Sequence, residues 1–303
     1  MKKTIIIYFL LLIAAQSIAC DICGGGLGAN YSGLLPNFNK KFIGIRYHFN
    51  QMNTQLNING EITALSNYEK YNTLELWSAW NIGQKWRLMT ILPYSFIDKH
   101  NIGTNLTNAK NGLGDISING YYNLLNQSKE DLINQSIWVG LGTKLPTGKY
   151  NNTEFNSNNS ANIYQLGTGS FDFLGSINYD IRYKSIGINA GIIYKINTEN
   201  KDDYRYGNKL TANANIYYHT QLPYQINIRP HIGLQYENQA KDQTIQYKLE
   251  ETGGENTNLI LGIETNFKMM AIGTNYQIPI KQNINNHRTE INKKLSAHIT
   301  YTF

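Results

Sequence analysis

The sequence predicts an all-β fold, a closed antiparallel transmembrane β-barrel of about 12 strands in an up-and-down meander over residues 42–303. Three observations predict it. Apolar residues recur at every second position in segments of roughly 8 to 13 residues, the connections alternate between short and long, and the last segment ends in an aromatic residue. Such segments fit a barrel because a tilted strand needs about 9 to 11 residues to cross a bilayer.

Each predicted strand is identified by alternate residues that share one apolar face. In the first half of the chain these faces lie within 43–49, 74–82, 86–96, 116–124, 137–145 and 171–181. In the second half they lie within 186–196, 210–218, 226–236, 259–267, 270–280 and 295–303. Turn residues predict short connections at 83–85, 184–185, 221–224 and 268, and long ones at 51–69, 98–112, 146–169, 197–208, 238–256 and 282–292.

The apolar face of these strands carries no charged residue. It holds 64 positions, of which about 10 would be charged at the chain's overall charge content of 16%. The opposite face carries seven basic and six acidic residues, namely Arg46, Glu75, Arg87, Asp115, Lys144, Asp172, Asp180, Arg182, Lys195, Arg229, Glu237, Glu264 and Lys294. The pattern predicts one uniformly apolar face and one that is polar throughout.

A soluble β-sandwich also alternates, but three features favour a membrane barrel. The strands exceed the usual five or six residues, the connections alternate in length, and aromatic residues such as Tyr47, Tyr94 and Tyr236 gather at strand ends, as in an interfacial girdle. The final alternation ends in Tyr301 and Phe303 and resembles the C-terminal signal that the outer-membrane assembly machinery recognises. Closure into a barrel also leaves no long strand edge exposed.

Composition excludes two other classes of protein. The chain has 303 residues with no linker-like run, and its mean hydropathy is −0.40. No uncharged apolar run beyond residue 20 reaches the roughly 18 residues of a spanning helix, so a helical membrane protein is excluded. The net charge of +6 comes from 27 Lys and Arg that are spread singly, so no nucleic-acid partner is predicted. The 41 Asn also disfavour long helices.

The N-terminus predicts export to the outer membrane of a Gram-negative bacterium. Lys2 and Lys3, an uncharged stretch over 4–15 and a small-x-small end at Ala19 predict a signal peptide over residues 1–19. The following Cys20-x-x-Cys23 can be a disulfide or inert pair, a metal pair or a redox dithiol. Lipidation of Cys20 is a further alternative. The Gly-rich segment 20–41 either hangs in the periplasm or folds back as a plug.

The polar face is predicted to line the lumen of the barrel. The candidate lining residues are Arg46, His48, Glu75, Arg87, Asp115, Lys144, Asp172, Arg182, Arg229, His231, Glu264 and His298. Because acidic and basic residues nearly balance, we expect an internal salt-bridge lattice rather than a selectivity ring of one sign. Twelve strands lie between filled eight-stranded barrels and open porins, which predicts a narrow or plugged pore. Four of the six His lie on the polar face, namely His48, His219, His231 and His298. They make a lumenal metal or proton site an alternative, but no cofactor is predicted.

No enzymatic activity is predicted. An outer-membrane phospholipase needs a Ser activated by a nearby His, yet no His-x-Ser occurs, and His298-Ile299-Thr300 would face the lumen. Asp98 with His100 is a lone candidate for an omptin-like protease pair. The main alternative to a channel is a non-conducting structural or adhesion barrel that acts through its long loops.

Three motifs occur in order around the longest predicted loop. They are Gly-Leu-Gly-Asp-Ile-Ser-Ile-Asn-Gly-Tyr-Tyr at 112–122, Leu-Gly-Thr-Lys-Leu-Pro-Thr-Gly at 141–148 and Leu-Gly-Thr-Gly-Ser-Phe-Asp-Phe at 166–173. This set resembles the outer-membrane barrel family labelled for the MetA-pathway of phenol degradation. The resemblance implies a porin-like transporter of small or hydrophobic solutes, with the lipid bilayer, the assembly machinery and a small-molecule solute as partners. The residues alone favour turn chemistry, with substrate gating as the alternative.

Overall fold

A computed structural model describes residues 40–129, 132–151, 162–245 and 247–303. The predicted signal peptide (1–19), Cys20, Cys23 and all but the last two residues of segment 20–41 lie outside the described residues. Within the described ranges, no helix is long and apolar enough to cross a membrane.

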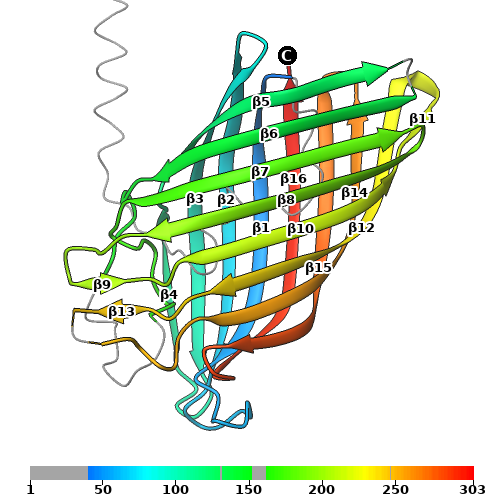
Figure 1. The fold of residues 1–303 in the computed structure, drawn as a ribbon. Helices are drawn as coiled ribbons and strands as arrows, with labels where there is room; N and C mark the ends of the chain where they lie inside the picture. Colours follow the sequence, from blue (N-terminus) through cyan, green and yellow to red (C-terminus); the bar gives the residue numbers. More distant parts are fainter. Residues whose placement is uncertain (1–39, 130–131, 152–161, 246) are drawn as a thin grey trace, which may run out of the picture.

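Twelve antiparallel strands close into a ring in the described part of the chain, which confirms the predicted barrel (Figure 1). The ring closes where the first strand pairs with the last, and Arg46 lies opposite His298 in that pair. The strands are β1 (Phe42–Thr54), β2 (Asn67–Ile82), β3 (Trp86–Asn101), β5 (Ser117–Lys129), β6 (Ile133–Lys144), β7 (Asp172–Tyr183), β8 (Ile186–Asn197), β10 (Lys209–Tyr218), β12 (Ile226–Gln239), β14 (Gly254–Phe267), β15 (Met270–Ile284) and β16 (Thr289–Thr302).

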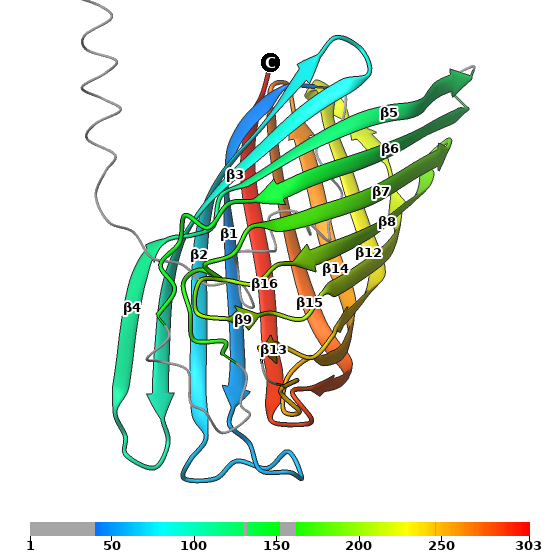
Figure 2. The same cartoon turned by 60° about the vertical axis from the view of Figure 1, so that its left-hand side comes forward.

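Shorter elements decorate the two ends of the ring. β4 (Thr107–Leu113) pairs with the outer part of β3 and extends the sheet as a hairpin (Figure 2). β9 (Tyr204–Arg205) and β13 (Gln243–Thr244) pair with each other across two loops at the same end. β11 (Thr220–Leu222) and the 3₁₀ turn η3 (Pro223–Gln225) connect β10 to β12 at the opposite end.

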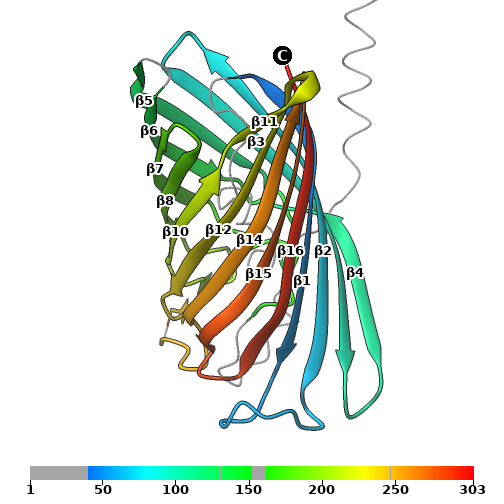
Figure 3. The same ribbon diagram turned by 90° about the vertical axis from the view of Figure 1, so that its right-hand side faces the viewer.

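Tight turns gather at one end of the barrel and the longer loops at the other. Lys184 and Lys268 have left-handed backbones, with φ of 51° and 53°, in two of the tight turns. The C-terminus lies at this turn end (Figure 3). Short turns face the periplasm in outer-membrane barrels, so the loop end is the outer end.

Several connections are shorter than the sequence predicted. Residues 285–288 replace the predicted loop over 282–292, residues 55–66 replace 51–69, and the stretch 98–112 is largely the β3–β4 hairpin. The prediction was wrong because it ended each strand where the apolar alternation ended. Strand pairing continues beyond the bilayer, where outward residues such as Asn111 need not be apolar.

The two faces of the wall differ as predicted in the spanning region. Outward residues are exposed although they are apolar, for example Ile45 at 54%, Leu76 at 48% and Ile192 at 53%. A continuous band of exposed apolar residues is the surface that a lipid bilayer covers. Tyr301 and Phe303 belong to this face, with their rings stacked at a centroid distance of 6.3 Å.

The inward face is not polar throughout, which corrects the prediction. Phe42, Trp77, Tyr121 and Trp138 occupy inward positions near the turn end and are buried together with Met89. Their neighbours on the wall alternate normally, so the apolar residues belong to the lumen and not to a slipped strand. They fill the lumen as a hydrophobic core would fill a soluble domain.

A β-bulge turns one more apolar residue inward near the loop end. The register between β1 and β16 shifts, because Gln51 pairs with Lys293 while Met52 pairs with Ile291. The extra residue on β16 reverses the alternation beyond it. Ile291 is therefore buried, although it shares the odd numbering of the lipid-facing residues of this strand.

Candidate functional site

A buried ion-pair cluster lies inside the wall formed by β1 and β2. The Arg46 Nε donates to Glu75 Oε2 at 2.6 Å, and His48 Nε2 lies 3.1 Å from the same oxygen. The side chains of Arg46 and Glu75 are fully buried. The cross-strand register places them directly opposite each other, which is why two alternating strands bring their charges together.

An inner constriction, which we define as Phe42, Trp77, Tyr121 and Trp138, adjoins this cluster toward the turn end. The Phe42 and Trp77 rings meet edge to face at a centroid distance of 4.5 Å. The Arg46 guanidinium lies 4.6 Å from the Trp77 ring centroid, and that of Arg87 lies 5.3 Å from the Phe42 centroid. Aromatic rings and stacked guanidinium groups thus fill the inner half of the lumen.

A second polar cluster lies on the neighbouring strands β12 to β16. His298 Nε2 lies 3.3 Å from Glu264 Oε2, and His231 Nε2 lies 2.6 Å from Asn275 Oδ1. A Cβ on Gly273 would overlap the Glu264 carboxylate and the His298 ring, so only glycine leaves room there. Arg229 is the cross-strand partner of Glu264, whereas the Arg182 guanidinium donates to the Lys184 carbonyl at 3.1 Å near the turn end.

The three sequence motifs converge on one buried cluster, the Lys144 cluster, formed by Asp115, Lys144, Thr168 and Asp172. The Lys144 ammonium lies 2.8 Å from Asp115 Oδ2 and 2.7 Å from Asp172 Oδ2, and it also contacts the Thr168 hydroxyl. The Asp115 carboxylate accepts hydrogen bonds from the backbone N–H groups of Gly148 and Thr168 at 2.9 and 3.0 Å. Each motif supplies one part of this cluster, so their order along the chain reflects one structural unit.

The Lys144 cluster anchors a loop segment that folds into the lumen. This segment, residues 162–170 between β6 and β7, places Ile163 and Leu166 in a buried apolar cluster. Its other members come from the inward faces of four strands, namely Met52, Tyr71, Ile97 and Ile291. The Lys110 ammonium donates to the Tyr164 carbonyl at 2.5 Å and so ties the segment to β4. The long loop therefore narrows the outer half of the lumen from within.

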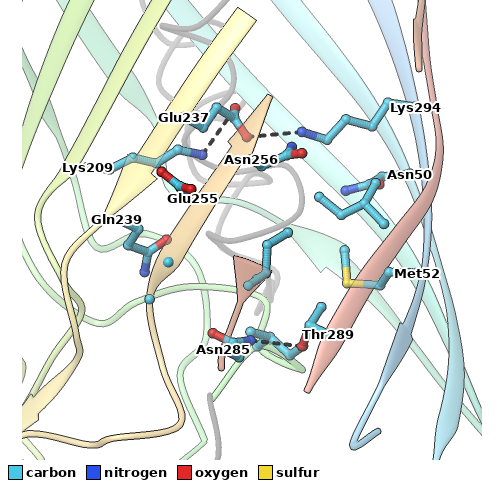
Figure 4. A pocket seen from close by; sticks show the side chains of 15 residues that line it. Asn50, Met52, Lys209, Glu237, Gln239, Glu255, Asn256, Asn285, Thr289 and Lys294 are labelled. Atoms are coloured by element: carbon cyan, nitrogen blue, oxygen red, sulfur yellow. Dashed lines mark hydrogen bonds and ion pairs between the residues drawn. The ribbon is translucent and has the colours of Figure 1, made fainter. Parts of the chain in front are cut away.

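A pocket with about 60 Å³ of room for water-sized molecules remains between this loop segment and the strands β10 to β16 and β1 (Figure 4). We call it the outer pocket. It lies at the loop end of the lumen, because its residues come from the ends of the strands nearest the loops. Its lining is Asn50, Met52, Ile163, Lys209, Glu237, Gln239, Gly253, Gly254, Glu255, Asn256, Ile284, Asn285, Thr289, Ile291 and Lys294.

Three of the four charged residues that line the outer pocket form one ion-paired group. The Lys209 ammonium lies 3.3 Å from Glu237 Oε1, and the Lys294 ammonium lies 3.1 Å from Glu237 Oε2. Figure 4 shows the two lysines reaching this carboxylate from opposite sides. Apolar side chains, with Met52, Ile163 and Ile291 among them, form the other side. The pocket thus offers both ion pairing and apolar contact to a small molecule.

The outer loops are held together by a separate buried carboxylate. Asp242 accepts hydrogen bonds from the Tyr204 hydroxyl and from the Gly207 backbone N–H, at 2.5 and 2.8 Å. Burial raises the pKa of Asp242 to about 6, although these hydrogen bonds oppose the rise. Burial likewise raises the pKa of Tyr150, beside it, to about 12. These hydrogen bonds join the loop that follows β8 to the loop that follows β12. Among the described residues, Asp242 makes no contact with the charged side chains of the outer pocket.

The sequence placed some of these groups and missed others. His48 and His298 lie on the paired strands β1 and β16, as expected, but each faces a different glutamate. Among the described residues, no group of three or more His, Cys, Asp and Glu is arranged to hold a metal ion. Lys209 and the apolar lining of the outer pocket were missed, because Lys209 stands directly before the first apolar residue of its strand and had no sequence signal of its own.

Comparison with known proteins places this barrel in a family. The family model described as "Putative MetA-pathway of phenol degradation" matches residues 46–278. The crystal structure of the COG4313 outer membrane channel from Pseudomonas putida F1 has a TM-score of 0.65 at 14% identity, covering 89% of this chain and 100% of that chain. The transport unit of the autotransporter AIDA-I from Escherichia coli has a TM-score of 0.50 at 10% identity, covering 92% of this chain and 96% of that chain. Both likenesses concern the outer-membrane barrel fold. None of the curated proteins matches the chain.

Proposed function

This chain belongs to the MetA-pathway of phenol degradation family, and we propose that it is an outer-membrane channel for a small amphipathic or hydrophobic solute. The observation that carries the proposal is the outer pocket, which combines a charged side with an apolar side inside the barrel. A binding pocket near the outer end is what a channel needs to capture a dilute solute before passage. Family membership and the barrel fold support the same proposal.

The inner constriction determines what kind of solute can pass. Trp77 is fully buried, and Tyr121 and Trp138 are nearly so, so a permeating solute would have to pass beside packed aromatic rings. A solute that carries apolar surface can replace contacts among these rings as it moves, whereas a hydrated ion would lose its hydration there. The proposal therefore excludes an open porin for sugars and salts.

A non-conducting structural barrel is the second candidate. The filled inner lumen favours it, since aromatic packing of this kind would also be expected in a barrel that passes nothing. The two candidates differ in one measurable property, the rate at which solutes cross the outer membrane.

The test is solute uptake by bacteria that produce the full-length protein, compared with the same strain without it. Suitable probes are 4-phenylbutyrate, 4-phenylbutanol and 4-phenylbutylamine, which share one apolar body. The channel proposal expects faster uptake of at least one probe, with little ionic conductance of the purified protein in planar bilayers. Equal uptake of all three with and without the protein would favour the structural barrel.

A further inference from the structure

We propose, building on the channel function proposed above, that the outer pocket binds an amphiphile with one carboxylate head group. The head lies between Lys209 and Lys294, and the apolar body lies against Met52, Ile163 and Ile291. The proposal names the chemical class of the solute and the residues that select it.

The charge count of the outer pocket carries the first step. Two ammonium groups share the Glu237 carboxylate, one on each oxygen. The other acidic residue of the lining, Glu255, is paired at 2.8 Å with Lys281, which is 73% exposed and outside the pocket. The four charges of the lining balance, but Lys281 neutralises Glu255 from outside. Lys209 and Lys294 therefore share the single carboxylate of Glu237, a group with a surplus of one positive charge.

Burial makes this surplus charge significant. The Lys209 and Lys294 side chains are only 18% and 11% exposed, and that of Glu237 is 8% exposed. A charge with so little access to water is stabilised by a counter-ion or by several hydrogen bonds. Each ammonium has three donors, of which Glu237 takes one, so both can also donate to a second carboxylate.

The neighbouring amides supply a further polar contact for a head group. Asn50 lies opposite Lys294 in the β1–β16 register and lines the pocket. Its Oδ1 is buried and has no hydrogen-bond partner among the described residues. A side-chain amide can present either its oxygen or its NH₂ group, so Asn50 can donate to a carboxylate that lies beside Lys294.

The apolar side of the pocket selects the body of the ligand. Met52 and Ile291 are buried at the loop end of β1 and β16, and the inward loop segment adds Ile163 above them. The methionine can adapt to bodies of different shape, because its side chain is unbranched and flexible. A simple inorganic anion would use the charged side and leave this apolar surface without a contact.

Cationic and neutral amphiphiles fit less well. An amine head would add a third ammonium group beside Lys209 and Lys294, which share the one carboxylate of Glu237. Like charges in contact repel strongly in a partly buried site. An alcohol head would leave the surplus positive charge uncompensated. The pocket therefore favours the anion, provided that the body is apolar.

The test is calorimetric titration of the purified full-length protein with the three phenylbutyl probes. We expect 4-phenylbutyrate to bind more tightly than 4-phenylbutylamine by about tenfold or more, the difference for one favourable charge contact. Lys209→Gln and Lys294→Gln should each weaken the binding of 4-phenylbutyrate by about tenfold and leave the binding of 4-phenylbutanol unchanged. Lys209→Arg and Lys294→Arg, which keep the charge, should retain binding and show that the site is intact.

Lys241→Gln is the matched control, because this exposed lysine pairs with Glu250, neither residue lines the pocket, and the change should leave binding unchanged. Tighter binding of the amine, or a carboxylate affinity that both glutamine variants leave unchanged, would overturn the inference. Equal binding and uptake of all three probes would overturn it while supporting the channel. Tight binding of 4-phenylbutyrate without uptake would support the pocket and overturn the channel.

Discussion

Asp115 and Lys144 meet at 2.8 Å although they come from two different motifs on either side of β5 and β6. Both side chains are 1% exposed, and Asp172 from the third motif completes the group. Because Thr168 donates to the same Asp115 carboxylate, the ion pair also fixes the loop segment that enters the lumen. The Lys144 cluster does not line the outer pocket, but it holds in place the loop segment whose Ile163 does.

Replacing Lys144 with Met should destabilise the barrel by about 3 to 5 kcal/mol, because two buried carboxylates would lose their shared cation. The urea midpoint for unfolding of the protein in lipid vesicles measures this change. Lys281→Met removes an exposed ion pair and should leave the midpoint unchanged. The triple variant Lys144→Met, Asp115→Asn, Asp172→Asn should recover much of the loss, and a triple variant no better than the single one would contradict this account.

Trp77→Ala should open the inner constriction. The side chain is fully buried among Phe42, Arg46 and His298, so its loss leaves a cavity that costs about 3 to 5 kcal/mol of stability. Ionic conductance in planar bilayers should rise. Trp80→Ala, on the outward face of the same strand, is the control and should not change conductance, since Trp80 is 45% exposed toward lipid. Equal conductance of both variants would argue that the barrier lies elsewhere.

Alanine substitutions at two glycines should differ in their effect on the stability of the barrel. Gly273→Ala should destabilise the barrel by about 1 to 3 kcal/mol, because its Cβ would overlap Glu264 and His298 inside the lumen. Gly175→Ala meets nothing within 4 Å on the outward face and should be neutral or slightly stabilising. Thermal unfolding of the two variants checks the difference, and a reversed order would show that the inward face has been assigned wrongly.

The outer loops should weaken as the pH rises. Burial raises the pKa of Asp242 to about 6, above its usual value near 3.9, so the folded loops bind a proton that the unfolded loops release. The resulting stabilisation is present in full below about pH 4 and is lost as the pH rises through 6, a change of about 3 kcal/mol. Hydrogen exchange of the two outer loops, residues 198–208 and 240–253, corrected for intrinsic rates, should show it. Asp242→Asn should remove the dependence, and an unchanged dependence would assign it to another group.

The sequence was sufficient for the barrel, and the reason is periodicity. A two-residue repeat with lipid on one side leaves few alternatives for strands as regular as β7 or β8, and their residues match the prediction closely. Where a bulge interrupts the repeat, as next to Ile291, the same rule fails, and the prediction placed this residue in a loop. The signal peptide, the fate of Cys20 and Cys23, the role of Tyr301 and Phe303 in assembly and the absence of an enzymatic activity all stay predictions.

The site was less predictable than the fold. Inward charges such as Arg46 and Glu75 were predicted to line the lumen because a charge in a strand must avoid lipid. Trp77 and Tyr121 were missed, because they lie on the strand face that carries the charges and that the prediction treated as polar throughout. The outer pocket was missed for a different reason. It depends on where the loop segment with Ile163 folds, and loops of this length are positioned by tertiary contacts such as the Lys144 cluster and not by local pattern.

The most direct test of the central claim, that solute passes through the outer pocket, is uptake by bacteria producing a variant in which the pocket is filled. Met52→Trp places a large ring in the pocket, whereas Leu76→Trp places the same ring on the lipid-facing side of the wall, where Leu76 is 48% exposed. Both proteins should be folded in the outer membrane before the comparison. The account predicts that uptake of the phenylbutyl probes falls to the level of cells without the protein for Met52→Trp and stays at the original rate for Leu76→Trp. Unchanged uptake through Met52→Trp would contradict it.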